Sequence, residues 1–316
     1  SEVLKNEIAK FSREEVAASA QEHLEYCLTS LVKHLFKKFK LKRMPLCLAG
    51  GVFGNVKLNQ KLKELECISE IFVQPQMGDG GLAVGAVCGS LAVRKLQPKF
   101  TSTMALGPFG GSEKDIQNIL LKNTKKFVAI NLSEDALINR IVDELNNDKV
   151  VGLVRGRMEF GPRALCQRSV LFKTSDVSCN DWLNKRMSRS EFMPFAPVMT
   201  NENAKKYLKN YSDTDLTLRF MTCTINVTDE FAKLCPAVTH IDNTARPHVV
   251  FKSTDPWMWH LLKKWEEVSK EPSLINTSFN KHEEPIIANY SEAFENLAEG
   301  VVDVLVLDDW LFTRKT

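Results

Sequence analysis

The sequence predicts an α/β fold, and three observations support that prediction. Short apolar runs typical of strands alternate with stretches of helical periodicity along most of the chain. Two of these strands end in glycine-rich turns, LAGGVFGN at 48–55 and QPQMGDGGLAVGA at 74–86, and each turn precedes a helix. The 316 residues, 44% hydrophobic and 26% charged, supply enough apolar side chains for roughly two cores.

Helix and strand are predicted to alternate through the first hundred residues. Apolar residues at three- and four-residue spacing predict a helix over 14–40. A short buried strand is predicted at 45–51 and another strand at 70–76, with helices over 52–65 and 82–96. Because adjacent strands would bring both glycine turns to one sheet edge, we expect a ligand to bind there.

A second unit is predicted after an irregular segment at 97–113, which contains Pro98, Pro108 and three glycines. We therefore divide the chain into residues 1–100 and 101–316. Strands are predicted in the second unit at 127–130, 149–156, 169–172, 195–199, 218–228, 273–280 and 302–308. Helices are predicted there at 133–147, 178–187, 255–269 and 290–300.

Composition narrows the cellular location and the binding partners expected for the chain. The eight cysteines never form a CxxC pair and stand in apolar surroundings, which predicts buried, reduced thiols in the cytoplasm and disfavours zinc. No apolar run is long enough to span a membrane, and the charged first residues do not resemble a signal peptide. Six positive residues lie between Lys33 and Arg43. They complement the end of the first helix, and nucleic acid is the less favoured explanation.

The glycine turns are candidate phosphate sites. Gly50 and Gly51 would let a ligand approach the backbone, and Asn55 offers an amide to a ribose, although a purely structural turn is the alternative. In the second turn Gly78 precedes Asp79, whose carboxylate is either a metal ligand or a helix cap.

Arginines carry the strongest chemical signal. The motif GRMEFGPRALCQRS places Arg163 after a Gly-Pro turn, close to Arg168, and Arg246 precedes a later strand. Arginines in fixed geometry suit phosphate. In LINTSFN the residues Asn276, Ser278 and Asn280 alternate along a strand end, so they share one face that suits an amide or a phosphate. No GxSxG, Walker A or HExxH motif is present.

Taken in this order, the motifs resemble the O-carbamoyltransferase family, which includes nodulation and antibiotic carbamoyltransferases. The resemblance rests on LAGGVFGNVKLN, FVQPQMGDGGLAVGA, GRMEFGPRALCQRS, EFMPFAPVM, PAVTHIDNTAR and LINTSFNKHEEPI. It implies that residues 1–100 are the last part of an actin-like ATPase domain, and that residues 101–316 are a YrdC-like domain. It also implies an ATP-dependent carbamoyltransferase. Carbamoyl phosphate and ATP would give carbamoyl-adenylate, and the carbamoyl group would pass to a hydroxyl of a small molecule or sugar.

The resemblance also assigns residues. It matches Asp79 to a metal-binding aspartate, the turn residues Gly50, Gly51, Asn55 and Gly78 to the nucleotide site, and Arg163 and Arg168 to the carbamoyl phosphate and ATP site. Further contacts there match Arg246 and Ser278, with Asn276 and Asn280 beside them.

Several departures from the family pattern alter these expectations. The HxxxH pair that supplies most metal ligands is absent, so we expect an incomplete site for a divalent metal such as iron or Mg²⁺. The amino-terminal half of the actin-like domain is also absent, and it becomes an expected partner. Without it the sheet edge would be apolar and exposed, which predicts aggregation or a homodimer.

Four substitutions fall within the family motifs. Cys166 and Gln167 replace Gly and Asn, whereas Met187 and Met193 replace a Lys and an Arg. These losses would weaken the binding of an anion unless a nearby cation substitutes, the candidates being Lys185, Arg186 and Arg189. Two alternatives therefore stay open: a nucleotide- or tRNA-binding module of a threonylcarbamoylation-like system, and a catalytically silent family member.

Overall fold

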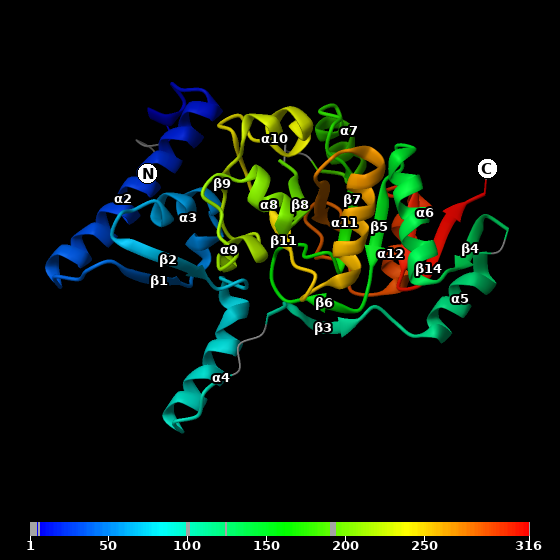
Figure 1. Cartoon of the computed structure of the whole chain (residues 1–316), viewed down its shortest axis with the longest axis horizontal. Coiled ribbons are helices and arrows are strands. Elements are labelled where there is room, and N and C mark those ends of the chain that lie inside the picture. The colour runs from blue at the N-terminus through cyan, green and yellow to red at the C-terminus, as the bar shows by residue number, and fades with distance from the viewer. Residues whose placement is uncertain (1–4, 6, 99–101, 124, 190–193, 316) are drawn as a thin grey trace.

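An eight-stranded mixed sheet forms the centre of the computed structural model, which describes residues 5, 7–98, 102–123, 125–189 and 194–315 (Figure 1). Its strands lie in the order β11 (His248–Val250), β8 (Ala196–Thr200), β12 (Leu274–Ser278), β7 (Arg168–Lys173), β5 (Val151–Val154), β13 (Val304–Leu307), β14 (Trp310–Arg314) and β4 (Phe127–Asn131). The β11–β8 and β13–β5 pairs are parallel, and the other pairs are antiparallel. We call residues 102–315 the body.

Helices cover both faces of this sheet, so its central strands are apolar on both sides. One face packs against α6 (Glu134–Asn146) and α11 (Pro256–Ser269). The other packs against α5 (Glu113–Asn123), α7 (Cys179–Arg186), α8 (Asn201–Tyr207), α10 (Asp229–Leu234) and α12 (Tyr290–Glu299). Shorter elements complete the body: α9 (Leu216–Arg219), the 3₁₀ helix η3 (Pro236–Val238), and the strand pairs β3 (Ala105–Phe109) with β6 (Arg157–Glu159) and β9 (Ile225–Asn226) with β10 (Thr244–Ala245).

Residues 5–98 form the N-terminal region, which has its own small core. Its elements are α2 (Arg13–Lys38), β1 (Met44–Leu48), η1 (Gly51–Gly54), α3 (Val56–Lys63), β2 (Ile68–Val73), η2 (Asp79–Gly81) and α4 (Leu82–Val93). Ser12 and Glu15 start α2 with a reciprocal capping box. Strands β1 and β2 pair in parallel as a two-stranded sheet. Helix α4 extends away from the rest of the molecule, and none of its residues is buried (Figure 1).

The two regions meet along α3. The Asn59 side chain is fully buried, and its amide donates to the carbonyl oxygen of Thr222 at 2.7 Å. The Thr224 hydroxyl donates to the Gln60 side chain at 2.7 Å. Ion pairs join Lys63 to Asp215 and Lys57 to Asp242. The contact is therefore mainly polar.

The long strand predicted at 218–228 is wrong. The segment holds α9, then an irregular stretch, then the two-residue strand β9. Asp215 caps α9, and Met221 has a left-handed φ of 54°, which a continuous strand cannot include. The hydroxyls of Thr222 and Thr224 are buried instead of facing solvent, because the first donates to the carbonyl of Thr217 and the second donates to Gln60 of α3.

The prediction of a buried first strand is also wrong, and so is the burial of every cysteine. In β1 only Leu48 is buried. Cys27 and Cys47 are exposed, although all eight cysteines are free as expected. In both cases the exposed residues belong to the N-terminal region, where no described element covers these parts of α2 and β1. No helix among the described residues is long and apolar enough to cross a membrane.

Candidate functional site

The glycine turns of the N-terminal region lie together, as their spacing predicts. The backbone N–H of Gly50, after β1, donates to the carbonyl of Met77, after β2, at 2.7 Å. Gly50 has a φ of +124°, a conformation that glycine adopts without strain. The third motif joins them, because a Cβ on Gly161 would lie 3.1 Å from the carbonyl oxygen of Pro75.

Arg163 reaches across this junction from the body. Its Nη2 donates to the carbonyl of Gly54 at 2.8 Å, while its Nε is buried and has no partner among the described residues. Burial lowers the pKa of the guanidinium. One side of Arg163 is thus fixed to the first glycine turn, and the rest of its charge is not neutralised.

Glu159 holds the loop that carries Arg163. This glutamate is 3% exposed, and its Oε1 accepts the backbone N–H groups of Leu165 (2.7 Å), Gln167 (3.2 Å) and Arg168 (3.2 Å). Burial raises its pKa, although these hydrogen bonds oppose that rise. Sequence reasoning missed Glu159, whose only signal is an acid two residues before Gly161 and Pro162.

Three arginines form an unneutralised cluster, Arg163, Arg189 and Arg246. Burial, together with the positive charges of Arg163 and Arg189, lowers the pKa of Arg246 from 12.5 to about 9. The Arg246 Nε is buried without a partner, and no described carboxylate forms an ion pair with any of the three. Arg189 donates to the Thr277 hydroxyl at 3.0 Å. Such a cluster provides strong donors for an anion.

Arg189 is the cation placed to compensate for the two methionines, Met187 and Met193. Met187 is fully buried in the core, and Met193 lies outside the described residues. Lys185 is exposed, and Arg186 pairs with Asp303 at 2.7 Å. Among the three candidate substitutes, only Arg189 joins the arginine cluster.

Arg168 occupies a different environment from Arg163. It is fully buried, and its two Nη atoms lie within 3.5 Å of five backbone carbonyl oxygens, those of Arg155, Gln167, Pro108, Gly156 and Ala288. These bonds tie Arg168 to β3, to the segment between β5 and β6, and to the segment before α12. Arg168 therefore holds the loop in place through its bonds to backbone carbonyls.

Two of the three polar residues of LINTSFN, Asn276 and Ser278, stand two apart on β12, whereas Asn280 lies beyond the end of the strand. The Asn276 amide is buried and donates to the carbonyl of Ala164 at 2.9 Å, and its Oδ1 is buried with no partner among the described residues. Ser278 is half-buried and pairs with Ser169 across β12 and β7. Asn280 lies beyond β12, where its amide donates to the carbonyls of Lys281 and Glu284, both at 2.8 Å.

The polar residues of the glycine turns have local partners or none. The Asn55 Oδ1 accepts the N–H of Leu58 and caps α3, while its amide donates to Gln21 at 2.6 Å. Gly51 opens η1, and Gly78 precedes Asp79, the first residue of η2. The Asp79 carboxylate is exposed. Within the described residues no group of three or more His, Cys, Asp or Glu could hold a metal ion, so the residues here do not fit a metal site.

Comparison with known proteins matches two family models. The carbamoyltransferase C-terminus matches residues 142–314, and the carbamoyltransferase N-terminus matches residues 1–88. The nodulation protein NolO of Bradyrhizobium diazoefficiens is 33% identical over 308 residues, which cover 95% of this chain and 55% of that protein. The nodulation protein NolNO of Sinorhizobium fredii is 32% identical over 96% of this chain and 44% of its own length.

The chain therefore spans about half the length of these curated relatives. A full-length HypF structure in its phosphate- and nucleotide-bound form aligns with 60% of this chain and 22% of its own, at 19% identity and a TM-score of 0.38. The C-terminal family model alone covers more than half of the residues. The chain belongs to the carbamoyltransferase family.

Proposed function

We propose that the chain is the carboxy-terminal part of an ATP-dependent O-carbamoyltransferase. The observation that carries this proposal is the cluster of Arg163, Arg189 and Arg246, which has no counter-charge among the described residues. Arg163, Arg189 and Arg246 are each half-buried, and holding three partly desolvated cations close together is costly unless an anion completes the site. Carbamoyl phosphate supplies such an anion, and its compact phosphate suits a cluster held in rigid geometry.

In the proposed reaction water releases phosphate from carbamoyl phosphate and leaves carbamate. A carbamate oxygen then attacks the α-phosphorus of ATP, and pyrophosphate leaves as carbamoyl-adenylate forms. The acceptor hydroxyl finally attacks the carbamoyl carbon, loses its proton and releases AMP. The arginines bind the departing phosphate and stabilise the charge that develops on the transferred groups.

The other residues position the cluster. Glu159 and Arg168 fix the loop of Arg163, and Asn276 anchors the same loop through the carbonyl of Ala164. Its unpartnered Oδ1 is suited to accept a hydrogen bond from the carbamoyl amide. Ser278, two residues further along β12, extends this polar edge. We derive no step through Asp79 and a metal, because the described residues do not complete such a site.

The test is pyrophosphate release that depends on carbamoyl phosphate and ATP. Arg246→Gln should lower the rate at least 100-fold, because removing one charge-assisted donor from such a site costs about 3 kcal/mol. Arg140→Gln is the matched control, since Arg140 is an exposed arginine on α6 that pairs with Glu144. Equal rates in Arg246→Gln and the control would reject the proposed role.

The exposed apolar face of the N-terminal region is where we place the expected partner. On α4, Leu82, Val87 and Val93 are 71%, 60% and 86% exposed, and β1 exposes Met44. We propose that this face packs against the remaining half of the actin-like domain, as the shorter length of the chain relative to its relatives suggests.

Without that half, the chain should associate with itself through the same face. Light scattering should detect dimers or larger species, and Val87→Glu should reduce them by placing a charge on α4. Monodisperse monomer in the unsubstituted chain would contradict this.

A further inference from the structure

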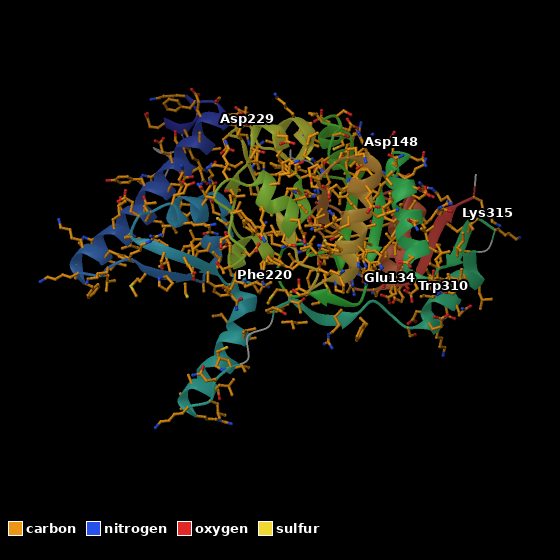
Figure 2. The ribbon with its side chains drawn as sticks, viewed as in Figure 1. Glu134, Asp148, Phe220, Asp229, Trp310 and Lys315 are labelled. Atoms are coloured by element: carbon orange, nitrogen blue, oxygen red, sulfur yellow. The ribbon has the colours of Figure 1, made fainter. Side chains whose placement is uncertain are left out.

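The large sheet of the body ends in two edge strands that differ in how they are covered. At one edge, all three residues of β11 are buried, and α8 and α9 lie against the strand. At the other edge, β4 pairs with β14, and no further strand among the described residues lies beside it. Figure 1 shows β4 on the side of the molecule away from the N-terminal region. In Figure 2, Trp310 at the start of β14 and Lys315 just after its end lie on that same side. Of the two edges, β4 is therefore the open one.

The open side of β4 carries backbone groups that the sheet does not use. The Leu132 N–H donates to the carbonyl of Asp309 at 3.0 Å, so residue 132 directs its backbone groups toward β14. Because this direction alternates along an antiparallel strand, the even-numbered residues of β4 also face β14 and the odd-numbered residues face away. The N–H and C=O groups on the open side are those of Phe127, Ala129 and Asn131.

The β4 strand lacks the features that usually keep an edge strand from pairing. Such strands typically carry a proline, a charged side chain or a bulge. The β4 sequence FVAIN has no proline and no charge, and its pairing with β14 runs through all five residues. On one face Val128 and Ile130 are 39% and 40% exposed. On the other, Phe127 and Ala129 help to line an apolar hollow of about 210 Å³ beside α5 and α12. Both faces of β4 thus offer apolar surface to an added strand.

The charges around β4 match those of a second copy of the same strand. Exposed lysines stand near its amino end, and exposed acids stand near its carboxyl end. These residues are Lys122, Lys125 and Lys126, and Glu134, Asp135 and Asp309, respectively. When two such strands run antiparallel, the amino end of each lies beside the carboxyl end of the other, so lysines meet acids at both ends. A contact of a surface with itself requires this self-complementarity, which favours a second copy of the chain as the partner.

We infer that β4 pairs antiparallel with β4 of a second copy, so that the two large sheets join across a two-fold axis at Ala129. Ala129 then exchanges two hydrogen bonds with its counterpart, and Phe127 pairs in the same way with the partner's Asn131. The axis stands perpendicular to the sheet. Val128 and Ile130 of both copies therefore come together on one face, and the apolar hollows lie on the other. Because this edge lies away from α4, the pairing is separate from the contact proposed for the N-terminal region, and it does not depend on the proposed reaction.

Hydrogen exchange, resolved to single amides, tests the pairing directly. The full chain carries Val87→Glu, which suppresses association through α4. The Ala129 amide should exchange about tenfold more slowly once nine-tenths of the chain is paired, because it then exchanges from the remaining monomer. The amides of Val128 and Ile130 already bond to β14, so their exchange should change far less with protein concentration. Equal exchange at Ala129 in dilute and concentrated protein would overturn the inference.

Two substitutions in β4 give a second test by light scattering. Ile130→Lys places a charge among the apolar side chains of the joined face, and Ala129→Pro removes the outward N–H but keeps the bonds to β14. Either one, added to Val87→Glu, should convert dimer to monomer. Val93→Lys is the matched control and should leave the dimer intact, since Val93 is 86% exposed on α4. Circular dichroism verifies that each variant folds. A monomer before either substitution, or a dimer that survives both, would reject β4 as the contact.

Discussion

The body and the N-terminal region use the same alternation of strand and helix but complete it differently. In the body, helices cover both faces of the large sheet, and strands β5, β8 and β13 are buried along their whole length. In the N-terminal region a two-stranded sheet has one helical face, and α4 buries none of its residues. The local sequence pattern therefore specifies the helices and strands in both regions, but only the body covers both faces of its sheet.

The difference teaches that apolar character alone does not predict burial. The α4 sequence LAVGAVCGSLAV is among the most apolar of the chain, yet it has nothing to pack against. Helix α11 is more polar, but its apolar stripe buries Trp257, Leu261 and Trp265. Burial depends on the second surface, which in the N-terminal region is absent from the described residues.

The largest expected effect on stability comes from comparing one substitution in each region. Leu261→Ala in α11 removes a fully buried side chain and should lower the free energy of unfolding by about 4 kcal/mol, because it leaves a cavity. Leu82→Ala in α4 should change it by less than about 0.5 kcal/mol, since Leu82 is 71% exposed. Urea denaturation measures both. Similar losses would show that α4 is packed in solution.

The next largest expected effect is a loss of stability at low pH, which should come from His248 in the body. Burial lowers the pKa of His248 from 6.5 to about 4, so between these values the unfolded chain binds one more proton than the folded chain. The free energy of unfolding therefore falls as the pH is lowered through this window, and His248 contributes about 3 kcal/mol of the fall.

His248→Gln should lose that part of the acid sensitivity. His34→Gln, at an exposed position on α2, should follow the wild type. The measurement is urea denaturation of the three proteins at pH 7 and pH 4.5. An identical acid response in wild type and His248→Gln would show that His248 is not buried as a neutral ring.

The sequence predicts the glycine junction well, because each turn follows directly from a strand and a glycine pair. The meeting of Gly50 with the chain after β2 needs only two adjacent parallel strands. For Arg163 the sequence predicts only that Gly161 and Pro162 redirect the chain before it, and its bond to the carbonyl of Gly54 depends on the fold.

The arginine cluster was not predictable as a whole. Arg163, Arg189 and Arg246 come from distant parts of the chain, and only the fold brings them together. Arg168 stands in the same motif as Arg163, yet backbone carbonyls surround it, and no local pattern distinguishes the two. The strand prediction for 218–228 failed for the same reason, because the Thr222 carbonyl and the Thr224 hydroxyl bond to α3, which lies far away in sequence.

The smallest expected effect concerns the contact between the regions. Asn59→Ala removes the amide that donates to the carbonyls of Phe53 and Thr222, both at 2.7 Å, and leaves those acceptors unsatisfied. The free energy of unfolding should fall by about 1 to 2 kcal/mol. Because this bond links α3 to the body, the loss should appear in a single transition if the regions unfold together. Unfolding is followed by the fluorescence of the body's tryptophans and by far-ultraviolet circular dichroism. If the substitution shifts only an early transition, the N-terminal region unfolds separately. The polar character of this contact makes the distinction sharp, since such bonds break without exposing a large apolar surface.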